Sequence, residues 1–176
     1  GVELDQGDMR GSLVTNYGGC MTDPTALPNF PPPADEHPLR GRILDVLGDL
    51  GAAPNLDADG DVAFTVNEQQ LFARCVESEP ALLRVFGQWA IDDGLLDDRL
   101  HLLEVSNEVS LNLNCVTTGI AERTLVVSSE HLVARNADVN AVVQIAVQGV
   151  LQGVHIWHQR AMGLDPSAPD GQEEPS

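Results

Sequence analysis

The chain has 176 residues, 43% of them hydrophobic, which suits one domain with its own core. It carries 27 acidic residues against nine basic ones, all arginine, for a formal net charge of −18. A surface this acidic repels nucleic acid and anionic lipid headgroups and attracts basic peptides or cations. We therefore set aside nucleic-acid and membrane-surface binding. The absence of lysine also favours a GC-rich bacterial genome.

The three cysteines and the apolar runs of the sequence indicate where in the cell the protein is located. Cys20, Cys75 and Cys115 form an odd set without a CxxC pair, which argues against disulfides and favours a reducing cytoplasm. Residues 1–20 lack the basic and apolar regions of a signal peptide. The longest apolar run, residues 141–151, is too short for a bilayer span and contains two glutamines. We expect a soluble, cytoplasmic protein.

Composition divides the chain into three parts. Residues 1–37 are rich in proline and predict a flexible N-terminal arm. Residues 163–176 are acidic, with proline and glycine, and predict a disordered tail. Residues 38–162 between them carry the periodic apolar patterns of a single folded domain.

The first predicted element is a helix over residues 38–51. Its apolar residues recur at three- and four-residue spacing, Pro38 suits the first turn, and Gly51 suits the end. The period then changes to two, which predicts strands. In chain order these are strands over 62–66, 69–76 and 79–90, the first two joined by a tight turn at residues 67–68.

Gly87 lies within the third strand and indicates a bulge or a close approach of the backbone. A second helix is predicted over residues 92–112 because Leu96, Leu100 and Leu103 return to helical spacing. Asn107 is the next position on that stripe. It is therefore predicted to face the core as a hydrogen-bonded structural anchor.

The last predicted elements are strands over 113–118 and 123–134 and a helix over 138–161 whose apolar stripe ends at Trp157. The resulting order is α-βββ-α-ββ-α. Consecutive strands without long crossovers predict an α+β fold, with an antiparallel sheet of about five strands and helices packed on it.

Small residues on these elements carry further predictions. Gly149 and Gly153 share a face of the last helix, which predicts close approach of that helix to the sheet or to a second copy. Cys75 and Cys115 fall in predicted strands and are expected to be small, buried, unreactive residues.

The stretch DADGD is the first candidate metal site. Asp57, Asp59 and Asp61 alternate as in an EF-hand loop, and Glu68 falls at the place of its last ligand. The glycine, however, is at the fourth position instead of the sixth, and a strand pattern follows. We interpret the stretch as a polar turn that leads into a hairpin, with weak calcium binding as the alternative.

His155 and His158 are the second candidate, because residues three apart on a helix can face one another. Two imidazoles supply at most half of a zinc shell. Near the helix end they are more typical of a solvated surface that complements the helix dipole. No nucleophile, phosphate-binding or zinc-protease motif is found, so we predict a protein without catalytic residues or cofactor.

Three stretches in their order and spacing resemble the YbjN family of bacterial proteins, proposed sensory transduction regulators. They are PALLRVFGQW (80–89), LLEVSNE (102–108) and the final helix (138–157). The resemblance implies a fold similar to type III secretion chaperones. The family often follows Asn-Glu with tryptophan and a second asparagine, whereas Val109 and Ser110 stand here.

The resemblance and the missing catalytic motifs imply a non-enzymatic, chaperone-like or adaptor domain. Such a domain would bind a protein or peptide, a basic one by charge, and form a homodimer. The candidate structural or partner-contact residues are Asn107, Trp89, Gly149, Gly153 and Trp157. The rival hypothesis is a small metal-binding protein or metal-dependent enzyme that uses either the aspartate stretch or the histidine pair.

Overall fold

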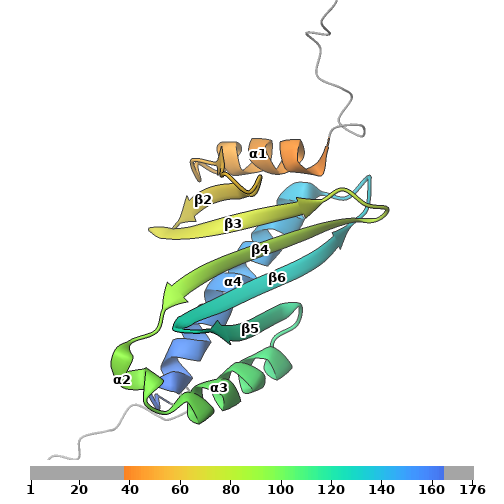
Figure 1. Cartoon of the computed structure of the whole chain (residues 1–176). Helices are drawn as coiled ribbons and strands as arrows, with labels where there is room; N and C mark the ends of the chain where they lie inside the picture. The colour runs from red at the N-terminus through yellow and green to blue at the C-terminus, as the bar shows by residue number, and fades with distance from the viewer. Residues whose placement is uncertain (1–37, 165–176) are drawn as a thin grey trace, which may run out of the picture. The chain divides into compact units, whose positions relative to one another are not determined.

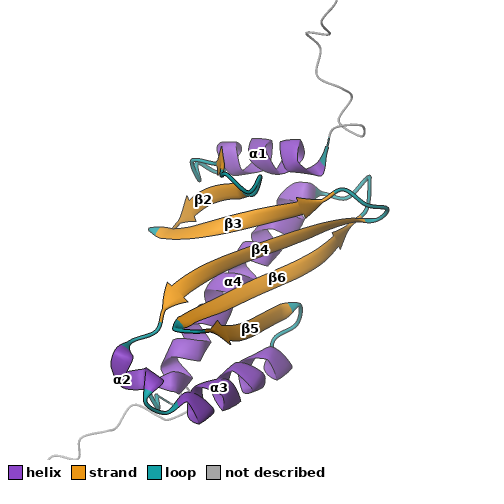
Figure 2. Ribbon diagram, viewed as in Figure 1, coloured by secondary structure: helices purple, strands orange, loops and turns teal. Residues whose placement is uncertain are grey.

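The computed structural model describes residues 38–164; the predicted arm (1–37) and residues 165–176 of the predicted tail lie outside the described residues. The described part has the predicted α+β class (Figure 2). Its elements in chain order are α1 (Leu39–Asp49), β1 (Asn55–Leu56), β2 (Val62–Val66), β3 (Gln69–Val76), β4 (Ala81–Ala90), α2 (Asp93–Leu96), α3 (Arg99–Asn112), β5 (Val116–Ala121), β6 (Thr124–Val133) and α4 (Val139–Ala161).

The six strands form one antiparallel sheet in the order β1-β2-β3-β4-β6-β5. The strand beyond the predicted five is β1, which has two residues and is too short to show a period. In Figure 1 the sheet faces the viewer and α4 crosses behind it, while α1 lies along the β2 edge and α3 along the β5 edge. One face of the sheet is therefore covered by α4.

The predicted ends of α1 and of the first hairpin are confirmed by the backbone. Pro38 is the residue before the first turn of α1, and Gly51 ends the helix with a φ of +71° that suits glycine. Asn67 and Glu68 both take positive φ, 49° and 63°, as a two-residue hairpin turn requires. Local sequence chemistry alone accounts for both features.

The prediction for the strand over 113–118 is wrong by three residues, because β5 begins only at Val116. Leu113 ends α3, and Cys115 takes a φ of +60°, which interrupts the extended chain. Cys115 is therefore exposed instead of buried. Cys75 lies half-buried in β3, where burial and then the charge of Glu77 raise the pKa of its thiol to about 12.

The predicted helix over 92–112 is split in two, and its core-facing stripe is wrong. Asp98 is the N-cap residue of α3, because its carboxylate accepts a hydrogen bond from the His101 backbone N–H at 3.1 Å. Asn107, predicted to face the core, is exposed. The residues of α3 that are buried are Leu102, Val105, Ser106 and Val109.

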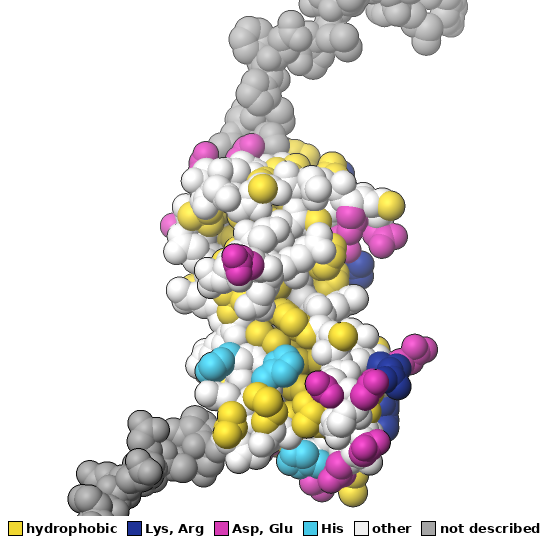
Figure 3. Space-filling view, turned by 90° about the vertical axis from the view of Figure 1, so that its left-hand side faces the viewer, with side chains coloured by type: hydrophobic (Ala, Val, Ile, Leu, Met, Phe, Trp, Pro, Cys, Tyr) yellow, Lys and Arg dark blue, Asp and Glu magenta, His cyan; other side chains and the backbone are white. Residues whose placement is uncertain are grey.

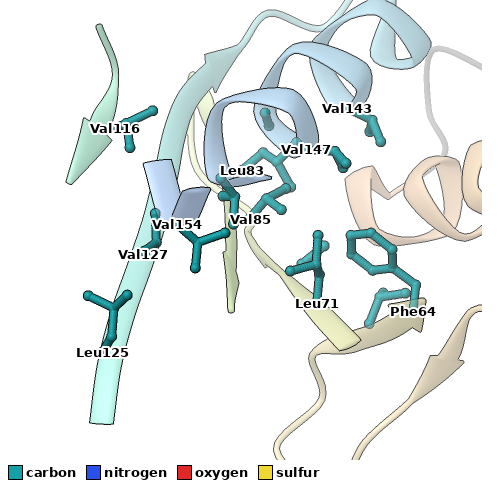
Figure 4. Close-up of a cluster of buried hydrophobic side chains, with 14 of the residues drawn as sticks. Phe64, Leu71, Leu83, Val85, Val116, Leu125, Val127, Val143, Val147 and Val154 are labelled. Atoms are coloured by element: carbon teal, nitrogen blue, oxygen red, sulfur yellow. The ribbon is translucent and has the colours of Figure 1, made fainter. Parts of the chain in front are cut away.

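The hydrophobic core lies between the sheet and α4 (Figure 4). Alternate strand residues such as Leu83, Val85 and Val127 meet Val143 and Val154 of α4 there. α1 completes the core beside β2 and β3, because its Ile43 and Leu47 belong to the same cluster as Phe64 and Leu71. The core residues labelled in Figure 4 are Phe64, Leu71, Leu83, Val85, Val116, Leu125, Val127, Val143, Val147 and Val154.

Close approach of α4 to the sheet is confirmed at both glycines. A Cβ added at Gly153 would lie 2.9 Å from Val127 Cγ1 and 3.0 Å from Val116 Cγ1. At Gly149 it would lie 3.0 Å from Val116 Cγ2. Gly87 likewise admits a neighbour, since its Cβ would be 2.3 Å from Cη2 of the Trp89 ring. The strand pairing continues unbroken through Gly87 on the β6 side, so close approach is the reason for the glycine.

By length and composition alone, α4 is one helix within the described residues that could cross a bilayer. The expectation from residues 141–151 considered only the unbroken apolar run, whereas the whole helix has 23 residues. In this structure α4 is a core helix, with its buried side chains packed on the sheet and on α1 and α3.

Candidate functional site

The second face of the sheet carries a mixed apolar and charged surface, which we call the open face. None of the helices in residues 38–164 covers it: α4 lies on the opposite face, and α1 and α3 follow the edges (Figure 1). The open face consists of Phe72, Arg74 and Val76 of β3, Leu82, Arg84 and Phe86 of β4, and Glu130 and Leu132 of β6. These residues alternate with the buried ones, as the period of a strand requires.

Strand register arranges the open face in three rows across the sheet. Leu82 pairs with Val76 and Leu132 in an apolar row, in which Leu132 is 71% exposed. Arg84 stands at the centre of the next row, which is charged. Phe86 leads the third row, where its ring stacks on that of Phe72 with centroids 5.4 Å apart.

The charged row places Arg74 directly opposite Arg84, an arrangement that is destabilising in itself. A carboxylate next to each arginine compensates: Asp61, just before β2, and Glu130 of β6. Asp61 accepts from Nε and Nη2 of Arg74 at 2.9 and 2.7 Å, and Glu130 accepts from Nε of Arg84. The hydrogen bond from Arg74, with the charge of Asp61, raises the pKa of the arginine. The Arg74 guanidinium also lies 5.5 Å from the Phe86 ring centroid.

Each edge of the sheet has a backbone hydrogen bond to a neighbouring segment, whereas the open face has no covering element within residues 38–164. At the β5 edge the Thr118 backbone N–H donates to Ser110 Oγ of α3 at 2.9 Å. At the other edge β1 pairs with β2, and the Thr65 N–H donates to the Ala52 carbonyl at 2.9 Å. Addition of a peptide strand would have to displace these bonds.

A second exposed apolar feature runs along α3, which we call the α3 stripe. It consists of Leu100, Leu103, Asn107 and Leu111. Leu100 and Leu111 are 68% and 79% exposed, although the helix also buries an opposite apolar face. Figure 3 shows hydrophobic side chains, with histidines among them, in the lower half of the molecule, where α2, α3 and the end of α4 lie (Figure 1). Exposed apolar groups grouped in this way are typical of contact surfaces.

The aspartate stretch forms the predicted turn. Asp57 Oδ1 accepts from the backbone N–H groups of Asp59 and Asp61, both at 2.9 Å. The side chain of Asp61 turns to Arg74 instead of toward the other aspartates, and Glu68 lies in the next turn. Within residues 38–164 no three His, Cys, Asp or Glu side chains are placed to hold a metal ion.

The histidine pair stays on the surface of α4. His155 is exposed, whereas His158 is half-buried and donates from Nδ1 to the Val154 carbonyl at 2.9 Å. The His158 ring also meets the Trp157 ring edge-on, with centroids 5.2 Å apart. This position in the last turn complements the helix dipole.

Sequence reasoning missed a buried hydroxyl network that ties α3, α4 and β5 together. Trp157 donates from Nε1 to Ser106 Oγ at 2.8 Å, and Ser106 donates to the Leu102 carbonyl at 2.9 Å. Thr118 donates from Oγ1 to the Ser106 carbonyl at 2.7 Å. The predicted contact residue Trp157 is therefore structural, and Trp89 is half-buried with Nε1 donating to Gln69.

A serine–histidine pair also escaped prediction. Ser129 Oγ lies 2.8 Å from His131 Nε2 on β6, and desolvation lowers the pKa of His131. Ser129 is 1% exposed beneath α4, so a substrate cannot reach its hydroxyl. The half-buried His131 ring thus provides a hydrogen-bond partner for the buried Ser129 hydroxyl.

The open face had a signal in the sequence that went unused. Strand β4 carries apolar residues at both odd and even positions, with Leu83 and Val85 in one set and Leu82 and Phe86 in the other. A strand covered on one side should alternate apolar with polar residues. The excess of apolar residues on β4 therefore marks a second face that is partly apolar.

No protein-family model and no curated protein sequence matches the chain. Its fold is similar to that of an uncharacterized protein from Methanothermobacter thermautotrophicus, with a TM-score of 0.56 and 7% identity over 71% of this chain and 97% of that one. It is also similar to YbjN from E. coli, a proposed transcription regulator, with a TM-score of 0.51 and 12% identity over 70% and 92%. At such identities the likeness concerns the fold alone. The described part of the chain thus has a YbjN-like α+β fold.

Proposed function

We propose that the protein is a non-enzymatic, cytoplasmic, protein-binding domain of chaperone-like or adaptor type. The observation that carries this proposal is the open face, where a stacked aromatic pair and exposed aliphatic side chains lie on a sheet face that no helix of residues 38–164 covers. Sheets usually bury such a face against another layer, and in this domain the layer would come from a partner.

Charge and chemistry support a protein partner over other classes. The net charge of −18 opposes nucleic acid and anionic membranes. Within residues 38–164, Asp61 pairs with Arg74 and no group of three metal-binding side chains is found, so the geometry offers no support for the metal-dependent rival. YbjN is described as a proposed transcription regulator, and a regulatory role here would act through protein contacts.

We also propose that the domain forms a homodimer through the α3 stripe. Its residues follow three- and four-residue spacing, the pattern of a paired helix, with Asn107 as a polar member of the seam. Antiparallel pairing centred near Leu103 brings the two copies of Leu103 together and places Leu100 near Asn107 of the other copy.

Site-specific photocrosslinking in cells tests the proposed function. A photoreactive amino acid at Leu132, on the open face, should capture a discrete protein partner. The same group at Leu56, which is 52% exposed on β1, is the matched control and should capture little. Equal capture at both positions, or none at Leu132, would reject a binding role for the open face.

A further inference from the structure

A groove of about 500 Å³ lies between α1, the turn after β2 and the first half of α4. It is separate from the open face, because α4 covers the opposite side of the sheet. The buried Leu47, Val143 and Val147 line it together with the half-buried Leu151 and with Leu50, which is 49% exposed. This apolar lining is of a size that can hold a peptide segment.

The walls of the groove are free of charge. Among the described residues that line it, none has an ionisable side chain, although the chain carries 27 acids and nine arginines. α4 has no ionisable residue at all from Val139 to Val154. A charged occupant would lose its water in such a groove without gaining a partner. The groove therefore favours an uncharged segment.

Two glutamines of α4 supply hydrogen-bond donors along the groove. Gln144 and Gln148 are exposed there, and their separation of four residues is about 6.0 Å along the helix. Gln144 donates to Asn140, which leaves its second amide hydrogen for an occupant. In a polyproline helix, carbonyls two residues apart are separated by about 6.2 Å, a close match. Because proline has no N–H, such a segment also leaves few donors unpaired.

The chain contains a segment with this chemistry before the described residues. Residues 24–34 (PTALPNFPPPA) hold five of the 11 prolines and no ionisable side chain. Leu27 and Phe30 are three residues apart, so they lie on the same side of a helix with three residues per turn. Residues 11–22 are also uncharged but contain no proline, and residues 165–176 carry four acids. Residues 24–34 are thus the best match in the sequence.

The position of the groove suits this segment. The described part begins at Pro38, directly before α1, and Leu50 at the groove is about 18 Å farther along that helix. In extended, proline-rich form the chain from Phe30 to Pro38 spans up to about 25 Å. The connection is therefore long enough, and its shortness gives the segment a high effective concentration at the groove.

We propose that the groove binds residues 24–34 of the same chain. Leu27 and Phe30 pack against its apolar lining, and Gln144 and Gln148 donate to carbonyl groups of the segment. The inference goes beyond the proposed function, since it uses neither the open face nor the α3 stripe.

Photocrosslinking within the purified full chain tests the inference. A photoreactive phenylalanine at position 30 keeps the aromatic ring of Phe30 and should crosslink to groove residues such as Leu50 and Gln148, as mapped by mass spectrometry. The same group at Tyr17, outside the segment, is the control and should yield few crosslinks to the groove. A pattern at position 30 that equals the pattern at position 17 would overturn the proposal.

Variants of α4 then locate the contact. Gln148→Glu places a carboxylate in the groove and should lower the yield of the Phe30 crosslink about tenfold, because the charge loses water when the segment binds. Gln152→Glu makes the same change at an exposed position one turn farther along α4 and is the matched control. Its yield should equal that of the wild-type chain. Equal yields in the two variants would contradict the proposed site.

Mixing isotopically labelled and unlabelled chains identifies the source of the segment. We expect crosslinks within one chain only. Crosslinks between copies, or capture of a different protein at position 30 in cells, would assign the groove to another occupant and overturn the proposal. Crosslinking at Leu132 on the open face is measured separately, so the proposed function and this inference can fail independently.

Discussion

At the residue scale, Ser106 is the polar residue on which three elements meet. Its hydroxyl accepts from Trp157 of α4, and its carbonyl accepts from Thr118 of β5. Ser106 is 5% exposed, so neither partner can turn to water without local opening. A buried donor left without an acceptor is more destabilising than the loss of an average hydrogen bond.

Ser106→Ala should therefore lower the free energy of unfolding by about 1–3 kcal/mol, because Nε1 of Trp157 is left buried and unpaired. Urea denaturation provides the measurement. The same substitution in a Trp157→Phe background should be much less damaging, since the orphaned donor is gone. Equal losses in the two backgrounds would show that the hydrogen bond is not the cause.

His131 adds a pH-dependent contribution. Its pKa is lower in the folded protein than the ordinary value of 6.5, because burial disfavours the charged ring. The unfolded chain therefore binds the proton more tightly, and stability falls as pH drops through 6.5 until the folded pKa is passed.

His131→Gln should flatten this part of the profile when the free energy of unfolding is measured between about pH 7.5 and pH 5. His155→Gln, at an exposed site on α4, should keep the wild-type slope because His131 is still present. A slope that is unchanged in His131→Gln would contradict the assignment.

At the element scale, α3 has two apolar faces, and helical spacing alone cannot predict which of them is buried. The predicted stripe through Leu100 and Leu103 follows helical spacing as well as the buried one does. The buried face was decided by partners on other elements, since Ser106 meets both Trp157 and Thr118. The sequence of α3 by itself does not reveal these partners on other elements.

Replacement of glycine by alanine is predicted to have opposite effects on stability in α1 and in α4. Gly48→Ala should stabilise the protein by about 0.5 kcal/mol, because alanine favours the helix and no atom lies within 4 Å of the new Cβ. Gly153→Ala should destabilise it by about 1–3 kcal/mol, since the Cβ meets Val127 and Val116. Thermal melting of the two variants side by side checks both. Stabilisation by Gly153→Ala would mean that α4 can move away from the sheet at little cost.

At the scale of the whole molecule, residues 38–164 leave two apolar surfaces exposed, the open face and the α3 stripe. In the proposed assembly the α3 stripe pairs with a second copy, and the open face receives another protein. A homodimer through α3 would present two open faces, and so two sites for a partner.

Leu103→Glu should halve the mass measured by light scattering, because it places like charges at the centre of the antiparallel seam. Asn107→Leu should preserve or strengthen the dimer by replacing the polar member of the seam. Leu132→Glu, on the open face, is the control and should leave the mass unchanged. A wild-type protein that is monomeric at micromolar concentration would contradict the homodimer.

Much of the fold was predictable because it depends on neighbours in the chain. The helix over 38–51, the turn at Asn67–Glu68 and the antiparallel order follow from apolar period, positive-φ turns and short links. The shift of β5 was not predictable, because the positive φ of Cys115 goes with a residue type that gives no warning of it.

Local pattern was thus sufficient for the α+β class, for α1 and α4, and for the aspartate turn, because each depends on interactions within a few residues. Which face of α3 is buried, and that β4 keeps an uncovered apolar side, emerged only from the packed molecule. The reason is that burial is a property of contacts between distant segments. The sequence shows the same apolar residue whether α4 covers it or it is left exposed for a partner protein.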